Sequence, residues 1–375
     1  MPVYDQQVTT YSDTTPHQRV ISDVINIISP TDTPLIAALG GISGARSKFK
    51  IREDGYKVEI LEDEMPQTSD TLAVAMTTSA LTLTVADASI FQPGDVILID
   101  AEYMVVSAVN VTTNVVTVFS RAYGGTNATH AISAVVEKVG MARLEGADAT
   151  FGHIVDIIAP YNYTSILQAG LNISGTMQKL SQHGIANEYE YQSYKQIPYL
   201  LTRLEAMMFH GVRNAGSATS PRSMGGLSTF ITTNSVAVGG AITKAKVDDA
   251  MEQAYLNGGQ PDLLVLNPGV ARDLKDVVDN SNFVKLGYEN TQVGMQPIQR
   301  VSTQYGQVQI VMSRWCPVST AFVLQSGKVG LYDFRQFEWK ELAMVGDSKR
   351  GEVVGEFSML VANEKAHVKL TGITS

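Results

Sequence analysis

The strongest periodic signal in the sequence is a run of apolar side chains over 186–209. Leu200, Leu204 and Met208 recur at the spacing that places apolar groups on one face of an α-helix. Polar residues, Glu205 among them, fall mostly on the opposite face. A helix of this length spans roughly 36 Å, because each residue adds about 1.5 Å.

Pro198 interrupts this run. A proline inside a helix removes one hydrogen bond and clashes with the preceding turn. We therefore expect either a kink at this point or two helices placed end to end.

A different pattern, of short alternating strands, covers 78–138. Apolar stretches recur about every ten residues and are separated by turn-forming clusters such as Gln92-Pro93-Gly94-Asp95. This spacing predicts a small five-stranded barrel or sandwich, which we interpret as a module inserted into the loop that precedes it. The expected strands are 81–85, 96–99, 103–109, 115–119 and 134–138.

Apolar and charged residues also alternate over 48–64, on both sides of Asp54-Gly55, a frequent hairpin turn. We expect a β-hairpin or a loop edged with charge here. The segment GGISGARSK at 40–48 lacks the Gly-Lys-Ser/Thr ending of a phosphate loop, and we expect a flexible turn. The triplet Glu62-Asp63-Glu64 has no further ligand at suitable spacing, which favours an exposed acidic surface over a metal or acid–base site.

The C-terminal half predicts a compact α/β region with a mixed sheet over about 235–325. Thr243 is placed to cap a helix over 244–256, and 263–266 is a fully apolar, buried strand. The strands that follow this region are assigned to the neighbourhood of the long helix, and they are expected at 329–332, 337–342, 353–360 and 367–370.

Composition limits the possible functions. The 375 residues allow two or three domains with a sizeable core. Only 17% of the residues are charged, which suits a surface covered by neighbouring subunits and equally a polar monomer. The net charge of −9 predicts no strong attraction to nucleic acid over the whole surface.

Sites for chemistry are scarce. Cys316 is the single cysteine, so an intrachain disulfide is excluded, and its apolar surroundings indicate a buried thiol. His130 has no partner histidine and is expected to be structural, and no pair of histidines has the spacing of a metal site on one helix face. The sequence contains no phosphate-loop, dinucleotide or nucleophile-elbow motif. No signal peptide and no apolar run of membrane-spanning length is found, so we expect a soluble cytosolic product.

Several short motifs follow one another along the chain: Thr33-Pro34-Leu35, VEILEDEMP at 58–66, FQPGDVILIDAEYMVV at 91–106, RAYGGTNATHA at 121–131, Glu145-Gly146-Ala147-Asp148, Asn162 to Ile166, Ile173 to Thr176, the helix end at His210-Gly211, and Gly225-Gly226-Leu227. In this order they resemble the major capsid proteins of tailed bacteriophages with the HK97-like fold. The motifs at 91–106 and 121–131 resemble the small β domain that one branch carries within its extended loop.

The resemblance implies an α+β fold of the HK97-like type, divided as follows: an N-terminal arm with short helices (1–45), the first half of an extended loop (46–77), an inserted small β-barrel or sandwich domain (78–138), the returning loop and a peripheral domain with the spine helix 186–209 (139–234), an axial domain (235–325) and closing peripheral strands (326–375).

The implied function is structural. Hexamers and pentamers would form an icosahedral head shell around double-stranded DNA, in a virion assembled in the host bacterial cytoplasm, with no catalytic residue, cofactor, metal or membrane. The short arm leaves no room for a long scaffolding extension, so a separate scaffolding protein and a portal are expected partners. The candidate subunit-interface residues are Lys50, Arg52, Glu62, Asp63 and Glu64. The alternatives are a tail or decoration component, or an enzyme with an unrecognised site in the α/β region.

Overall fold

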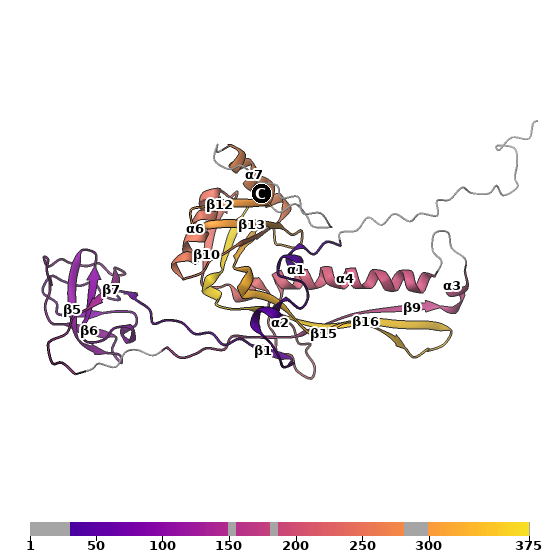
Figure 1. The fold of residues 1–375 in the computed structure, drawn as a ribbon, viewed down its shortest axis with the longest axis horizontal. Coiled ribbons are helices and arrows are strands. Elements are labelled where there is room, and N and C mark those ends of the chain that lie inside the picture. The colour runs from indigo at the N-terminus through magenta and orange to yellow at the C-terminus, as the bar shows by residue number, and fades with distance from the viewer. Residues whose placement is uncertain (1–30, 149–154, 181–186, 281–298, 375) are drawn as a thin grey trace, which may run out of the picture. The chain divides into compact units, whose positions relative to one another are not determined.

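The computed structural model of the chain describes residues 31–148, 155–180, 187–280 and 299–374. It divides into two compact units: Met1–Ile60 with Pro160–Ser375, and Leu61–Ala159. Figure 1 shows the elements of both. Residues 1–30, the larger part of the N-terminal arm expected over 1–45, lie outside the described residues.

The long amphipathic helix is confirmed as α4 (Glu188–His210). It begins at Asn187, whose side chain accepts a hydrogen bond from the backbone N–H of Tyr189 at 3.1 Å. The helix continues through Pro198, so the alternative of two separate helices is wrong. Proline at this position removes one hydrogen bond, to the carbonyl of Tyr194, on a part of the helix where Tyr194 is 76% exposed.

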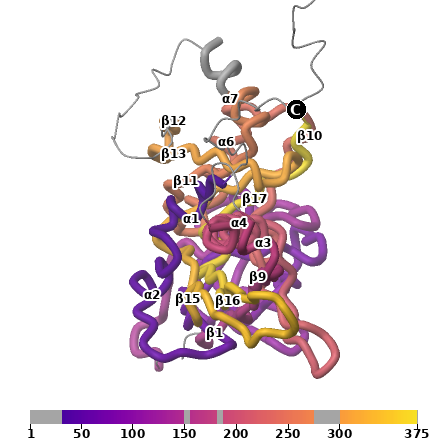
Figure 2. The backbone as a smooth tube through the Cα atoms, turned by 90° about the vertical axis from the view of Figure 1, so that its right-hand side faces the viewer, coloured from indigo at the N-terminus to yellow at the C-terminus, as the bar shows by residue number. Residues whose placement is uncertain are grey.

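Helix α4 packs against an antiparallel sheet with the order β15-β16-β9 (Figure 2). Its strands are β15 (Val329–Leu342), β16 (Ser348–Val361) and β9 (Ser165–Ser174). The segments 329–332 and 337–342, expected as two strands, form the single strand β15 with irregular register between Asp333 and Glu338. Leu200, Leu204 and Met208 all lie in the core that helix and sheet share, as their spacing predicts.

The second sheet of this unit is mixed and has the order β10-β17-β14-β11-β13-β12. Its strands are β10 (Ser235–Gly240), β17 (Val368–Ile373), β14 (Thr320–Leu324), β11 (Leu263–Leu266), β13 (Gly306–Met312) and β12 (Gln299–Thr303). Helices α6 (Lys244–Leu256) and α7 (Pro268–Asn280) share an apolar core with one face of this mixed sheet. Thr243 caps α6 as expected, since its side chain accepts from the N–H of Lys246 at 3.4 Å.

The apolar strand β11 is buried on both faces. Leu264 and Leu266 belong to the core of α6 and α7, while Leu263 and Val265 belong to the core of α4. A strand covered on both sides has no polar face, which explains the continuous apolar run in the sequence.

The expectation that all strands after residue 326 pack with the long helix is wrong for β17. This strand lies in the mixed sheet, parallel to β10 and antiparallel to β14. Val368 and Leu370 are fully buried in the core beneath α6 and α7, which fixes the strand there. His367, just before it, accepts the N–H of Gln325 through Nδ1 at 3.2 Å, and burial lowers its pKa to about 4.

The segment at 40–48, expected to be a flexible turn, is a turn only over 40–43. Residues Gly44–Phe49 form helix α2, which follows α1 (Pro34–Ala38). Ala45 is fully buried against Gly330 of β15, where a Cβ atom would lie only 2.8 Å from the Cα of Ala45. Glycine at 330 therefore allows the helix to approach the strand closely, and this tertiary contact stabilises a segment with weak helical propensity.

The expected hairpin about Asp54-Gly55 is also absent from the described residues. Strand β1 (Lys57–Glu59) pairs instead with β8 (Tyr161–Tyr163). The carboxylate of Asp54 accepts hydrogen bonds from Arg46 at 2.6 Å and from the hydroxyl of Tyr332 at 3.0 Å. These bonds hold the turn against α2 and β15, so the chain that follows pairs with a distant strand.

The other short helical elements of the described residues are α3 (Gly175–Lys179), α5 (Leu227–Phe230), and the 3₁₀ turns Ala88–Ile90, Ser326–Lys328 and Glu364–Ala366. Ser174 caps α3 by accepting a hydrogen bond from the N–H of Met177 at 3.4 Å.

The second unit, Leu61–Ala159, contains one antiparallel sheet in the order β2-β7-β4-β5-β6-β3. Each of the five expected strands has a counterpart, and β2 adds a sixth that precedes residue 78. The strands are β2 (Ser69–Thr71), β3 (Thr82–Thr84), β4 (Asp95–Ile99), β5 (Glu102–Asn110), β6 (Val115–Val118) and β7 (Val135–Met141). A separate apolar core, which includes Ile97, Met104 and Val136, lies within this unit.

The chain leaves and re-enters the first unit at adjacent points. The N–H of Ile60 donates to the carbonyl of Pro160 at 3.0 Å. Within the second unit, Glu62 and Ile158 pair in antiparallel fashion through bonds of 2.8 and 2.9 Å. Adjacent entry and exit points are the geometry that tolerates removal of a domain.

We therefore expect that replacing Leu61–Ala159 with a short Gly/Ser linker leaves the first unit folded. None of the core residues that surround α4 or cover β11 belongs to the replaced segment. Circular dichroism and thermal unfolding of the shortened chain test this expectation, with the intact chain as control. An insoluble or unfolded product would show that the two units depend on a shared core.

Candidate functional site

The five interface candidates occupy different settings. Lys50 and Arg52 are exposed, and Lys50 ends α2 with a positive φ of 52°. Asp63 is exposed and Glu64 is half-buried. Glu62 is only 7% exposed, so the triplet is not uniformly an exposed acidic surface, because the backbone pairing with Ile158 turns this residue inward.

The most unusual carboxylate of the first unit is Glu205, which is fully buried on α4. It accepts hydrogen bonds from the N–H groups of Leu35 at 3.3 Å and Ile36 at 3.5 Å, at the start of α1. Its Oε1 also accepts from the hydroxyl of Ser313 at 2.6 Å. Helix α1 has no capping side chain of its own, so Glu205 supplies the cap from a residue far away in sequence.

The surroundings of Glu205 set its protonation. Burial raises its pKa to about 7, and the nearby negative charge of Asp32 acts in the same direction. The hydrogen bonds from Ser313, Leu35 and Ile36 oppose this rise. Cys316 is buried nearby as expected, and burial raises the pKa of its thiol, with a smaller effect from Glu205.

The segment before α1 is held to the same region by two further bonds. The carboxylate of Asp32 pairs with Arg314 at 2.9 Å, and its carbonyl accepts from the indole N–H of Trp315 at 3.1 Å. Helix α4, the end of β13 and the beginning of α1 thus meet at Glu205. We call Asp32, Leu35, Ile36, Glu205 and Ser313 the α1 junction. The expectation that Glu205 lies on the polar face of the helix is wrong, because its partners on α1 and after β13 are distant in sequence and leave no local pattern.

The second unit has a buried carboxylate of the opposite character. Glu102 is 1% exposed and binds both Nε and Nη2 of Arg121 at 2.7 Å. It also accepts from the N–H groups of Ala122 and Ala128 at 2.9 Å and lies 3.0 Å from Nε2 of His130. The guanidinium of Arg121 is the main cause that lowers the pKa of Glu102 to about 2.

This arrangement fixes an exposed loop at both ends. Arg121 and His130 are buried, whereas the residues from 123 to 129 are exposed. The expectation that His130 is structural is confirmed, because its ring nitrogens lie 2.7 Å from Oδ2 of Asp100 and 3.0 Å from Oε2 of Glu102. We call 122–129 the clamped loop. Because Glu102 accepts hydrogen bonds at both of its ends, the loop is held in position although the residues in its middle are exposed.

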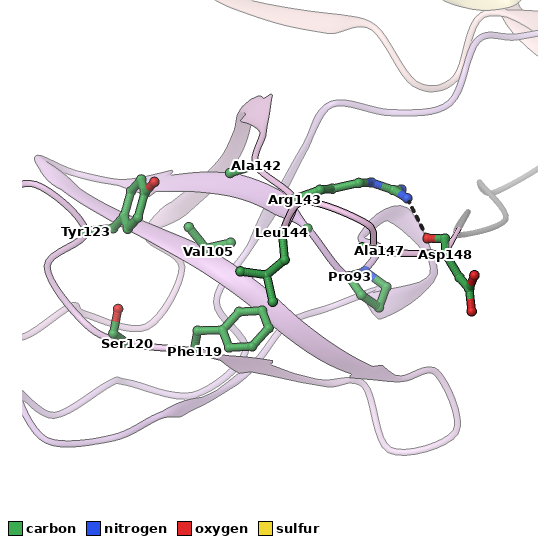
Figure 3. Close-up of a pocket in the computed structure, with 11 residues that line it drawn as sticks. Pro93, Val105, Phe119, Ser120, Tyr123, Ala142, Arg143, Leu144, Ala147 and Asp148 are labelled. Atoms are coloured by element: carbon green, nitrogen blue, oxygen red, sulfur yellow. Dashed lines mark hydrogen bonds between the residues drawn. The ribbon is translucent and has the colours of Figure 1, made fainter.

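A pocket of about 320 Å³ lies beside the clamped loop, within the second unit (Figure 3). Val105, Phe119 and Leu144 lie close together in Figure 3, and Tyr123 of the clamped loop stands at the other end. Three of these side chains are largely exposed: Leu144 at 77%, Phe119 at 63% and Tyr123 at 52%. The pocket is therefore a mainly apolar surface open to solvent.

One wall of the pocket is the chain that follows β7. The N–H of Ala142 donates to the carbonyl of Gly94 at 2.7 Å. Gly94 has a φ of +94°, and a Cβ atom there would lie 3.1 Å from the carbonyl oxygen of Ala142 and 3.2 Å from Cγ of Arg143. Glycine thus permits the close approach. Arg143 in turn donates to the carbonyl of Asp148 at 3.3 Å, which closes the wall.

Charge is divided unequally between the units. Leu61–Ala159 contains twelve Asp and Glu residues but three Lys and Arg residues, which gives this unit a net charge of −9. The rest of the chain contains 25 acidic and 25 basic residues and is formally neutral. The charge of the whole protein is therefore the charge of its second unit, a distribution that the overall composition conceals.

In the described part of the chain, no group of three or more His, Cys, Asp and Glu side chains is placed to hold a metal ion. Among the same residues, no helix has both the length and the apolar character needed to cross a membrane.

Comparisons with known proteins identify a family, a curated relative and solved structures that share the fold. The family described as "SU10 major capsid protein" matches residues 6–374. The major capsid protein of Escherichia phage Phieco32 is 21% identical over 256 residues, which are 54% of this chain and 70% of that protein. Solved structures of two particles share the fold over 99% of this chain and 100% of theirs: Mycobacterium phage Bobi (TM-score 0.51, 10% identity) and the capsid of a native GTA particle (0.52, 9%).

The α1 junction predicts a pH-dependent stability. The folded-state pKa of Glu205, about 7, lies above its ordinary value of 4.5, so the folded chain binds more protons between these values. The contribution of Glu205 to the free energy of unfolding is then highest below about pH 4.5. It falls by on the order of 3 kcal/mol as the pH rises to 7. We expect Glu205→Gln to remove this part of the slope.

Urea unfolding at pH 5 and pH 7 measures this effect. Glu190→Gln, which alters an exposed carboxylate of the same helix, serves as the matched control and should retain the slope of the unaltered chain. An equal slope in Glu205→Gln and the unaltered protein would contradict the assignment.

Proposed function

This chain belongs to the SU10 major capsid protein family, whose model matches residues 6–374, and we propose an arrangement of its copies in the head shell of a bacteriophage. It is a major capsid protein with the HK97-like fold, a mixture of helices and strands. The observation that carries the function is the family match along nearly the entire chain, and its role is structural.

We propose that the copies form hexamers and pentamers in an icosahedral shell. The mixed sheet with α6 and α7 serves as the axial domain, around which copies meet. The three-stranded sheet with α4 serves as the peripheral domain. Contacts between different surfaces of identical subunits close into rings when the rotation between neighbours permits it, which supports this arrangement.

The second unit is proposed to be a small β domain inserted into the extended loop. Its own core and the paired connections at Glu62 and Ile158 support this assignment. The neutral first unit suits a wall that encloses double-stranded DNA without binding particular sequences. A separate scaffolding protein and a portal are the proposed partners, assembly is proposed to take place in the host cytoplasm, and no catalytic step is assigned.

The first test is assembly itself. Purified protein at micromolar concentration, with and without a candidate scaffolding protein, is expected to form rings or closed shells in electron micrographs and to scatter light accordingly. An enzyme would give small oligomers, and a tail component would give tubes. Exclusively monomeric protein under all these conditions would contradict the proposal.

The second test concerns the interface candidates. Lys50 and Arg52 are exposed and basic, and Asp63 is exposed and acidic, so neighbouring copies are proposed to pair them. We expect Lys50→Glu with Arg52→Glu to reduce the yield of shells severalfold without altering the circular dichroism spectrum. Adding Asp63→Lys and Glu64→Lys restores opposite charges and should recover part of the yield. A yield that the first pair of substitutions leaves unchanged would exclude these residues from the interface.

A further inference from the structure

The second unit combines an open apolar pocket with a concentrated negative charge. Leu144, Phe119 and Tyr123 expose 77%, 63% and 52% of their surface around one cavity. Covering large apolar side chains is favourable, by about 25 cal/mol for each Å² removed from water. Exposed apolar surface of this kind, gathered at a preformed cavity, is typical of interaction sites.

The negative charge of the second unit disfavours binding of the molecules that would surround it in a shell. A second copy of this unit carries −9 as well, and like charges oppose its approach. Packaged nucleic acid is a polyanion and is repelled in the same way. The remainder of a neighbouring copy has 25 acidic and 25 basic residues, so apart from the local pairing proposed for Lys50 and Arg52 with Asp63 it offers no net attraction. This step rests on the proposed shell, because the shell determines which molecules are neighbours.

We propose that this pocket binds a separate basic protein, which inserts one large apolar side chain beside Phe119 and Leu144. Lysine or arginine residues that flank the inserted side chain lie against the acidic surface of the unit. Glu145 and Asp148, both exposed in the wall segment that follows β7, are the acidic residues nearest in sequence to Leu144. Apolar burial supplies affinity, and the opposite charges direct the partner to this unit.

The pocket is ready for such a partner before binding. Tyr123 belongs to the clamped loop, whose ends are fixed by Glu102. The opposite wall is fixed by the bond between Ala142 and Gly94 and by that between Arg143 and the carbonyl of Asp148. A preformed site loses little conformational freedom on binding, which favours recognition of a single anchoring side chain.

A labelled peptide tests the proposal on the full-length protein. The probe is a fluorescein-labelled peptide with one tryptophan between two pairs of lysines, and binding is followed by fluorescence anisotropy. We expect Phe119→Ser with Leu144→Ser to weaken binding about tenfold, as for a lost anchor contact. The matched control Ile132→Ser alters a side chain of the same unit that is 62% exposed and does not line the pocket, and it should bind within about twofold of the unaltered protein.

Two control peptides separate the contributions. One replaces tryptophan with alanine, the other replaces the lysines with glutamates, and both are expected to bind at least about tenfold more weakly. Raising NaCl from about 50 to about 300 mM should weaken the lysine peptide severalfold. Equal binding of either control peptide, or unchanged binding by the pocket variant, would overturn the proposal.

The pocket variant also reports on the other possible occupant. If Phe119→Ser with Leu144→Ser abolishes shell formation while the chain remains folded, the pocket is a contact between copies and the proposal is wrong. Normal shells with lost peptide binding support it. Failure of the unaltered protein to form shells would instead count against the proposed function, whereas the peptide titrations would still give their own result.

Discussion

The arrangement of the first unit depends on one buried carboxylate. Glu205 lies on α4, yet its hydrogen bonds satisfy the first N–H groups of α1 and the hydroxyl that follows β13. The N-terminal segment, the longest helix and the mixed sheet are therefore joined at one point. A buried acid is costly unless it is paired or protonated, and here it is kept because it replaces a missing helix cap. The position of α1 thus depends on the protonation of a residue distant in sequence.

The pKa values of the two buried carboxylates are shifted in opposite directions because their surroundings differ. Glu102 faces the guanidinium of Arg121 and two backbone donors, so its negative form is favoured. Glu205 has no cation among its hydrogen-bond partners and accepts from neutral groups, so burial dominates. The first arrangement gives a loop that stays fixed over the usual range of pH. The second gives a junction that responds to pH near neutrality, at the place where the N-terminal segment meets the body of the subunit.

Local patterns were sufficient to predict the elements that periodicity controls. The spacing of Leu200, Leu204 and Met208 predicted α4, and the unbroken apolar run of β11 predicted a strand covered on both faces. Errors arose where distant residues decide the outcome. Helix α2 exists because Ala45 packs on Gly330, and β1 pairs with β8 because Asp54 is bound by Arg46 and Tyr332. The α1 junction was missed for the same reason, since a helix cap supplied by another helix leaves no pattern near either one. The order of short motifs, by contrast, was enough to predict the family.

The clamped loop separates the part of the chain that must be kept from the part that is free to vary. Glu102 and Arg121 hold its ends, while a side chain added at Gly125 would meet no atom within 4 Å. Substitutions in the middle of this loop would change the surface of every copy at little cost in folding. Changes of sequence at this loop would therefore alter what each copy presents to solvent, while the ion pair beneath it keeps the fold of the unit constant.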